Sequence, residues 1–189
     1  MNTLFWFGII LIGFTYIGYG IVVSLWVKLR GKMIIPDNNT ADEDLPAVTL
    51  LIACFNELDI LAEKLENCRA LDYPKDKLDI LFITDGSSDG SELYLQRQAG
   101  VLVMHQAPRN GKIAAVKRAM KNVQTPITVL TDANTFLNPG AVRRMVADFA
   151  DPTVGAVAGE KRVISQGDAS SGGEGLYWKY ESFLKRKDS

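Results

Sequence analysis

The feature that most constrains this chain is an uncharged apolar run over residues 4–27, which reads LFWFGIILIGFTYIGYGIVVSLWV. As an α-helix the run would extend about 36 Å at roughly 1.5 Å per residue, enough to cross a hydrocarbon core of about 30 Å with some tilt. A cleaved signal peptide would instead begin with basic residues and end at a small-residue cleavage site. Residues 1–3 carry no basic side chain, and no A-x-A site follows. We therefore expect an uncleaved membrane anchor over residues 1–32.

Positive charge lies on only one side of this run. Lys28, Arg30 and Lys32 follow it directly. Because basic flanks remain on the cytoplasmic side of a membrane, the pattern predicts a single-pass protein of the inner (plasma) membrane whose remaining residues lie in the cytoplasm. Residues 33–46 are polar and acidic, which is typical of a linker.

The composition of the whole chain excludes some functions. The formal net charge is −1, so no basic surface indicates a nucleic-acid partner. Cys54 and Cys68 have no second Cys/His pair that would complete a zinc site, and we expect two reduced thiols. His105, the single histidine, follows an apolar run and is expected to be an ordinary residue at a strand end.

Short apolar runs alternate with amphipathic segments after the linker. Strands are predicted at residues 48–53, 78–83, 101–104, 127–130 and 154–158, with helices between them. This alternation is typical of an α/β domain with a mostly parallel sheet and flanking helices, which we assign to residues 47–160. Residues 161–189 follow as a Gly/Ser-rich segment and an amphipathic helix that would pack either on the domain or at a membrane surface.

Polar side chains follow three of the predicted strands. Asn56 and Glu57 come after the first strand, Asp85 after the second and Asp132 after the fourth. Right-handed crossovers bring the carboxyl ends of parallel strands to one edge of the sheet, where α/β proteins bind ligands. The sequence therefore predicts a binding site at this edge.

Two oxygen-bearing side chains in this set are suited to a metal ion. Asp132 and Asn134 are two positions apart, so in extended backbone they point to the same side. Carboxylate and amide oxygens are ligands that Mg²⁺ and Mn²⁺ prefer. The alternative is a turn in which both side chains cap the backbone.

Two loops are suited to a phosphorylated nucleoside. The polar loop TDGSSDGS begins at Thr84, and its Asp85 carboxylate can accept an N–H from a base. Arg109 and Lys112 flank a glycine just before a helix, where the helix dipole favours an anion. Each loop could also be a solvated turn. Neither has the spacing of a dinucleotide fingerprint or a P-loop.

Taken together, four motifs resemble a known family. They are ACFNE at 53–57, TDGSSD at 84–89, RNGK at 109–112 and TDAN at 131–134, in that order. This set is similar to the family 2 glycosyltransferases of the GT-A (Rossmann-like) fold, including bacterial synthases of poly-N-acetylglucosamine, hyaluronan, chitin and cellulose type. The resemblance covers roughly residues 48–160.

The resemblance implies a nucleotide-sugar donor, with a UDP-sugar as the expected one, a divalent metal (Mg²⁺ or Mn²⁺), and inverting transfer to a glycan or lipid-linked acceptor. The residues expected to bind the donor are Ala53, Phe55, Asn56, Glu57, Asp85, Ser87, Arg109, Lys112 and Asp132, and those expected to bind the metal are Asp132 and Asn134. The family's metal triplet usually ends in a second Asp, so Asn134 departs from the pattern.

The family's catalytic base and its Gln-x-x-Arg-Trp motif have no match in the chain, and we assign no catalytic residue. Two interpretations follow: a sugar transferase for which this chain supplies the donor site, or a membrane-tethered binding or regulatory module. A nucleotidyltransferase is a weaker third, because such enzymes carry a glycine-rich loop after the first strand. The sequence does not determine the oligomeric state.

Overall fold

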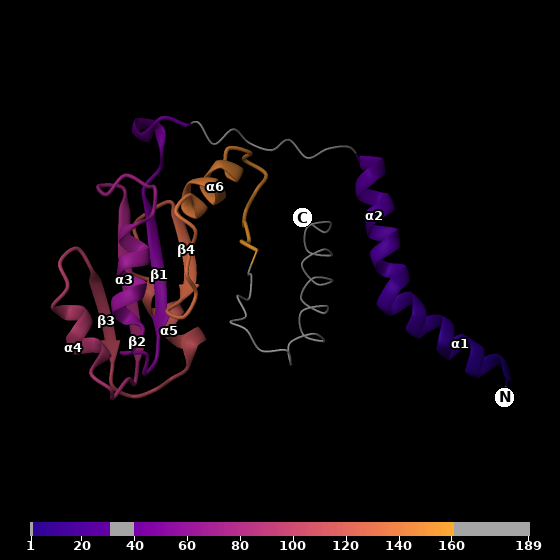
Figure 1. Ribbon diagram of the computed structural model, residues 1–189, viewed down its shortest axis with the longest axis horizontal. Coiled ribbons are helices and arrows are strands. Elements are labelled where there is room, and N and C mark those ends of the chain that lie inside the picture. Colours follow the sequence, from indigo (N-terminus) through magenta and orange to yellow (C-terminus); the bar gives the residue numbers. More distant parts are fainter. Residues whose placement is uncertain (1, 31–39, 161–189) are drawn as a thin grey trace. The chain divides into compact units, whose positions relative to one another are not determined.

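The computed structural model describes residues 2–30 and 40–160 (Figure 1). The described residues fall into two units, which we treat separately: an amino-terminal helix and an α/β domain. The Gly/Ser-rich segment and the amphipathic helix predicted over residues 161–189 lie outside the described residues, as do Lys32 and the first half of the predicted linker, residues 33–39.

The amino-terminal helix consists of α1 (Asn2–Gly13), a π-helical turn η1 (Phe14–Gly18) and α2 (Tyr19–Arg30). Residues Asn2–Trp26 are long and apolar enough to cross a membrane. The helix bends where the π-turn interrupts it (Figure 1), as wider turns commonly cause. A Cβ at Gly18 would lie 2.6 Å from the Phe14 ring, so any larger residue there would require that ring to move. The hydroxyl of Thr15 donates to the carbonyl of Leu11, which satisfies a polar group inside the apolar run.

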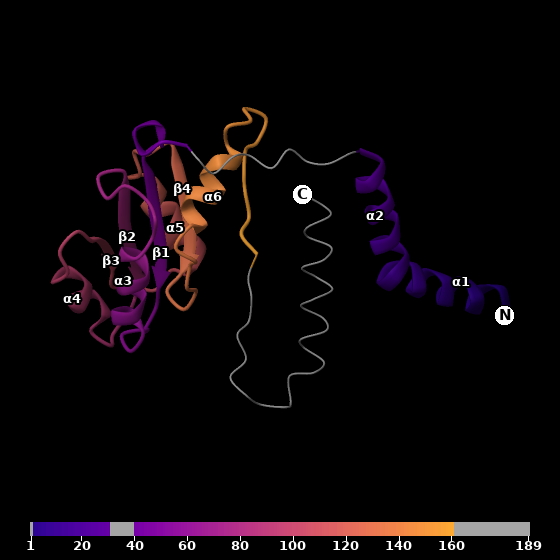
Figure 2. The same ribbon diagram turned by 45° about the horizontal axis from the view of Figure 1, so that its top comes forward.

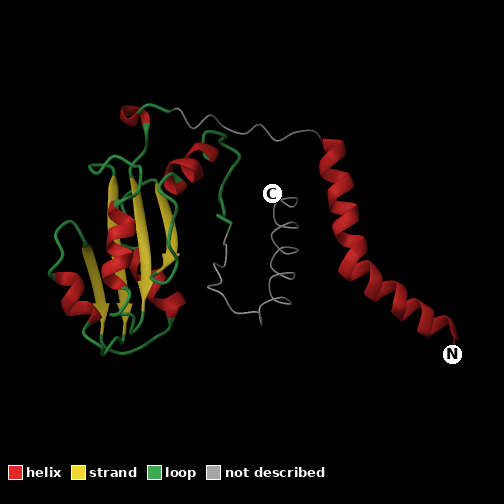
Figure 3. Cartoon of the chain, in the orientation of Figure 1, coloured by secondary structure: helices red, strands yellow, loops and turns green. Residues whose placement is uncertain are grey.

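The domain is built on a four-stranded parallel sheet with strand order β3-β2-β1-β4 (Figure 3). The strands are β1 (Val48–Cys54), β2 (Leu78–Asp85), β3 (Leu102–Gln106) and β4 (Ile127–Asp132). The predicted α/β class and the parallel arrangement are confirmed. From β1 the chain adds β2 and β3 on one side and then returns to add β4 on the other side of β1. This topological switch point between β1 and β4 determines where the site lies.

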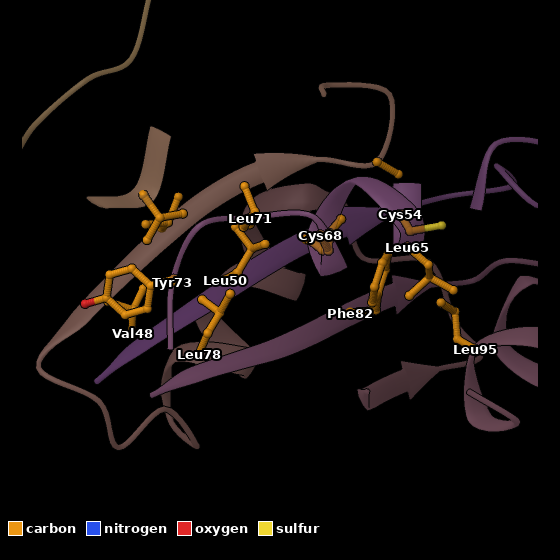
Figure 4. Close-up of a cluster of buried hydrophobic side chains, with 14 of the residues drawn as sticks. Val48, Leu50, Cys54, Leu65, Cys68, Leu71, Tyr73, Leu78, Phe82 and Leu95 are labelled. Carbon is orange, nitrogen blue, oxygen red and sulfur yellow. The ribbon is translucent and has the colours of Figure 1, made fainter. Parts of the chain in front are cut away.

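The helices are α3 (Leu61–Arg69), α4 (Ser91–Gln96), α5 (Lys112–Met120) and α6 (Ala141–Asp148) (Figures 1 and 2). Side chains alternate between the two faces of β1 because a strand has a period of two. Leu50 and Ile52 pack in one core with residues of α3 and α6, part of which Figure 4 shows. Leu51 packs in a second core with residues of α5. Helices therefore bury both faces of the sheet, as parallel sheets require.

The predicted fifth strand at residues 154–158 is wrong. This segment follows α6 without strand structure, and Val154 and Val157 are only half-buried. A strand needs a ladder of hydrogen bonds as well as apolar residues, and the described residues provide no partner strand for this segment. The helix between β2 and β3 begins only at Ser91, because the polar loop continues to Gly90, which has a positive φ of 90°.

The last residues before β1 are fastened to the domain. They form a short 3₁₀ turn, η2 (Asp42–Asp44). The Lys77 ammonium donates to the carbonyls of Asp42, Glu43 and Leu45 at 2.6–2.9 Å. The Tyr73 hydroxyl donates to the carbonyl of Pro46 at 2.6 Å. The chain therefore enters the domain at the amino ends of the strands, opposite the edge that carries the site.

Candidate functional site

A pocket of about 270 Å³ lies at the carboxyl ends of the central strands. It is located where the strand order reverses between β1 and β4, the position at which open α/β sheets bind ligands. The register places Ala53 beside Asp132, and Cys54 beside Thr84. The residues that line the pocket are Ala53, Cys54, Phe55, Glu57, Ile83, Asp85, Arg109, Lys112, Ala115, Asp132 and Asn134. Eight of the ten predicted site residues, all except Asn56 and Ser87, are therefore brought together.

Asp85 joins the end of β2 to the loop before α5. Its carboxylate is buried, and Oδ2 accepts hydrogen bonds from the backbone N–H groups of Asn110 and Gly111 at 2.8 and 2.6 Å. The other oxygen, Oδ1, accepts no hydrogen bond and lies 3.5 Å from Nη1 of Arg118. Asp85 thus fixes the RNGK loop with one oxygen, while the other is buried beside the Arg118 guanidinium.

Glycine is required next to Asp85. Gly86 has a φ of 75°, and a Cβ there would lie 2.8 Å from Cβ of Arg109. The Gly86 N–H donates to the carbonyl of Gln106 at 2.8 Å, which continues the contact between β2 and β3. The two loops that border this side of the pocket can therefore touch only because residue 86 has no side chain.

Asn56 and Ser87 do not line the pocket but join two of its loops. The Asn56 N–H donates to Oγ of Ser87 at 3.2 Å, and Oδ1 of Asn56 accepts from the N–H of Ser88 at 2.9 Å. Asn56 has a φ of 51°, a left-handed conformation that Asn tolerates better than most residues. The Asp89 carboxylate adds a third link by accepting from the N–H of Leu58 at 2.9 Å. These residues hold the pocket's rim in place.

An aromatic ring and a guanidinium group form one wall. Cζ of Arg109 lies 3.7 Å from the centroid of the Phe55 ring, within the range of a cation–π contact. Both residues line the pocket, and each comes from a different loop. The stacked pair provides a flat apolar surface with positive charge beside it, which is suited to a planar base attached to an anionic group.

The opposite side of the pocket is acidic. The Lys112 ammonium, at the start of α5, donates to Oδ1 of Asp132 at the end of β4. Glu57 lines the same pocket, and burial raises its pKa above the usual range, an effect to which the charge of Asp132 adds. Lys112, the last residue of the RNGK loop, therefore links the loop predicted to face phosphates to the residue predicted to bind a metal.

Asp132 and Asn134 fit a divalent cation by the chemistry of their donors. Both offer oxygen atoms to the pocket, as Mg²⁺ and Mn²⁺ prefer. Within the described residues no cluster of three or more His, Cys, Asp or Glu side chains could enclose a metal. A cation here would therefore take its remaining ligands from water and from a ligand's phosphates, which is common for Mg²⁺ sites.

The two cysteines and the single histidine have environments that fit a structural role. Both cysteines are buried and free of disulfide bonds. Cys54 lines the pocket, but burial raises the pKa of its thiol to about 11, so it is protonated at neutral pH. His105 does not line the pocket: Nδ1 lies 2.7 Å from Oγ1 of Thr84, and Nε2 lies 3.3 Å from the Glu92 carboxylate.

Sequence reasoning missed Arg118, Lys64 and Asn67, which do not line the pocket but contact residues or loops that do. Arg118 on α5 donates to Oε1 of Gln106 at 2.5 Å and lies beneath Asp85. Lys64 and Asn67 on α3 contact the loop after β4. A lysine on the buried face of a predicted amphipathic helix was the one available signal, since burying an ammonium is costly without a partner.

Similarity to solved structures agrees with this geometry. A mannosyltransferase from Pyrobaculum calidifontis, solved in complex with GDP-Man and Mn²⁺, matches with a TM-score of 0.69 and 29% identity over 81% of this chain and 46% of that one. S. aureus TarS in complex with UDP-GlcNAc matches with a TM-score of 0.50 and 16% identity over 56% of this chain and 31% of that one, a likeness of fold alone. The fold and the site thus define a GT-A-type glycosyltransferase domain.

Sequence comparison identifies the family. Residues 49–188 match the family described as Glycosyl transferase family 2. The chain belongs to this family. It is also 33% identical over 132 residues to the poly-beta-1,6-N-acetyl-D-glucosamine synthase of Staphylococcus aureus (strain MSSA476), and 26% identical over 125 residues to the synthase of that name in Staphylococcus epidermidis. The first match covers 68% of this chain and 31% of the synthase.

Proposed function

We propose that the protein is a membrane-anchored glycosyltransferase that transfers a sugar from a nucleotide-sugar, a UDP-sugar in the first instance, to a glycan or lipid-linked acceptor with inversion. This chain supplies the donor site and the metal site. The observation that carries the proposal is the convergence of Asp85, Arg109, Lys112 and Asp132 in one pocket at the reversal point of the sheet. Family membership and the sequence similarity to polysaccharide synthases support it.

The nucleoside would occupy the side of the pocket formed by β2 and the RNGK loop. The Asp85 carboxylate lines this side of the pocket and is the proposed acceptor for a ring N–H. Its Oδ2 also accepts two backbone N–H groups, and its Oδ1 is buried beside Arg118. The stacked Phe55 and Arg109 give a base an apolar face. Uracil and guanine each present a ring N–H, so the titration described below compares UDP with GDP.

The diphosphate would extend toward Lys112 and Asp132. Lys112 is at the first turn of α5, where the helix dipole adds to its positive charge. Asp132 and Asn134 would hold the divalent cation, which when bound neutralises charge on the departing diphosphate. Lys112 is paired with the Asp132 carboxylate in the structure. Once Asp132 binds the cation instead, the Lys112 ammonium would be free to pair with the phosphates. We assign none of the described residues the role of the base that deprotonates the acceptor.

The location follows from the amino-terminal helix. We propose that residues 1–32 anchor the protein in the inner (plasma) membrane as a single span, that residues 33–46 link it to the domain, and that the domain at 47–160 is cytoplasmic. The apolar length of Asn2–Trp26 supports the span, and the basic residues that follow it support the orientation.

The test is a binding titration on the full chain in detergent micelles. UDP, GDP and UDP-GlcNAc are titrated by calorimetry with Mn²⁺, with Mg²⁺ and with EDTA. We expect UDP and UDP-GlcNAc to bind and the metals to tighten UDP-GlcNAc binding. A folded chain that binds none of the three nucleotides would refute the proposal. Preference for GDP would replace the UDP-sugar by a GDP-sugar.

A further inference from the structure

The loop that carries the proposed metal ligands has little structure of its own. It runs from Asp132 at the end of β4 to Gly140 before α6. Within it, the Thr135 N–H donates to the carbonyl of Asp132 at 3.2 Å, and the Ala133 N–H donates to the carbonyl of Ala53 at 3.2 Å. Asn134 is exposed. Beyond the turn at Asp132, this loop therefore depends on contacts from elsewhere to keep one conformation.

Lys64 of α3 supplies one such contact. Its side chain is completely buried, and Nζ donates to the carbonyl of Thr135. Nζ also lies 5.9 Å from the centroid of the Phe136 ring. Burying an ammonium group is unfavourable unless its hydrogen-bonding capacity is used, so an apolar residue would be the ordinary choice at this position of a core-facing helix. Lys64 forms no salt bridge within the described part of the chain, which makes the loop carbonyl its principal partner.

Asn67 supplies a second contact one turn further along α3. Its Nδ2 donates to the carbonyl of Leu137 at 2.8 Å, and its Oδ1 accepts from the N–H of Leu137 at 2.9 Å. The amide thereby binds both backbone groups of one loop residue, as a neighbouring strand would. Positions three apart lie on the same face of a helix, so Lys64 and Asn67 together grip residues 135–137.

We propose that Lys64 and Asn67 are positioning residues that hold the loop after β4 so that Asp132 and Asn134 face the pocket together; this inference rests on the proposed function. The residues they hold directly follow Asn134, and the backbone of Thr135 also bonds to Asp132. Releasing residues 135–137 frees the amide of Asn134 to leave the pocket, while Asp85 at the end of β2 and Phe55 after β1 keep their places.

The experiment compares Asn67→Ala with Glu66→Ala in the full chain in detergent. Asn67 is partly buried and its replacement removes both bonds to Leu137, whereas Glu66 is an exposed neighbour on the same helix. UDP-GlcNAc binding is titrated against Mn²⁺, and UDP binding is measured in EDTA. We expect Asn67→Ala to raise the Mn²⁺ concentration for half-maximal binding about tenfold, to leave the metal-free UDP affinity within twofold, and Glu66→Ala to change neither. An unchanged Mn²⁺ midpoint, or equal losses with and without metal, would overturn the proposal.

Hydrogen exchange of residues 132–138 provides a readout that needs no ligand. We expect the backbone N–H groups of this loop to exchange faster in Asn67→Ala and in Lys64→Met, which keeps the buried volume but removes the donor, and to be unaffected in Glu66→Ala. Unchanged exchange in both variants would overturn the grip of α3 on the loop. If the affinity of the unmodified chain for UDP-GlcNAc does not depend on Mn²⁺, the proposed role of Asp132 and Asn134 as metal ligands is wrong. The exchange result still decides whether α3 holds the loop.

Discussion

Replacing Asp85 by Asn changes charge with almost no change in shape. In the structure, Oδ2 accepts two backbone N–H groups at 2.8 and 2.6 Å, and Oδ1 lies 3.5 Å from the Arg118 guanidinium. Bonds to a charged acceptor stabilise a protein by about 1.5–3 kcal/mol each and neutral ones by about 0.5–1.5 kcal/mol. Neutralising the acceptor should therefore cost about 1 kcal/mol per bond. Leaving Arg118 without its countercharge adds a similar amount, so we expect the free energy of unfolding to fall by about 3 kcal/mol.

The same substitution should weaken nucleotide binding without regard to metal. If the Asp85 carboxylate accepts the ring N–H of the base, exchanging a charged acceptor for an amide should cost about 1–2 kcal/mol, or roughly five- to thirtyfold in the Kd of UDP. Calorimetric titration of UDP in EDTA and in Mn²⁺ should show the same factor under both conditions. Urea unfolding followed by circular dichroism measures the stability change.

Asp79→Asn is the matched control for this prediction. Asp79 is on the same strand as Asp85 but is exposed at the other end of β2. We expect its replacement to alter neither stability nor UDP affinity appreciably. If folded Asp85→Asn bound UDP within twofold of the unmodified chain, the nucleoside would not contact Asp85. If the loss appeared only with Mn²⁺, Asp85 would belong to the metal side of the pocket.

Three further results are expected. Asp132→Ala should abolish the Mn²⁺-dependent part of UDP-GlcNAc binding and leave UDP binding in EDTA nearly unchanged. Without metal, the substitution only removes a carboxylate that competes with the phosphates for Lys112. Equal losses in both titrations would contradict this. Phe55→Ala should weaken UDP binding about two- to fivefold, because it removes the stacking surface that positions Arg109, worth about 0.5–1 kcal/mol at an accessible site; Phe55→Tyr, measured by the same calorimetry, should restore the affinity. Burial would raise the pKa of Asp89, but hydrogen bonds from a hydroxyl and from backbone amides lower it below the usual value. Its stabilisation is thus present above the unfolded-state pKa of about 4 and lost as the pH falls through the folded-state pKa, so thermal unfolding of Asp89→Asn should depend less on pH between about 5 and 3.

The sequence allowed the fold to be predicted where local patterns alone determine it. The apolar strands β1, β2 and β4 and the amphipathic helices between them have the periods expected of buried elements, and all were placed within a few residues. The same reasoning failed at residues 154–158, where the apolar pattern is present and a pairing partner is not. Strand formation depends on the neighbouring strand, and sequence patterns within a single segment carry no information about that neighbour.

Some residues of the candidate site could likewise be predicted from local patterns, and others could not. Asp85, Lys112 and Asp132 could be predicted because each directly follows or precedes an element whose end lies at the ligand-binding edge of any parallel sheet. Arg118, Lys64 and Asn67 could not, because their partners are distant in sequence: Lys64 binds a carbonyl 71 positions away, and Asn67 one that is 70 away. From α3 alone, the position of Lys64 on the apolar face of the helix indicates burial but does not identify the partner. Only the packing of α3 against the loop after β4 brings the side chain to its acceptor. The groups that line the pocket are thus predictable from element ends, whereas the groups that hold them in place emerge only when the tertiary structure is known.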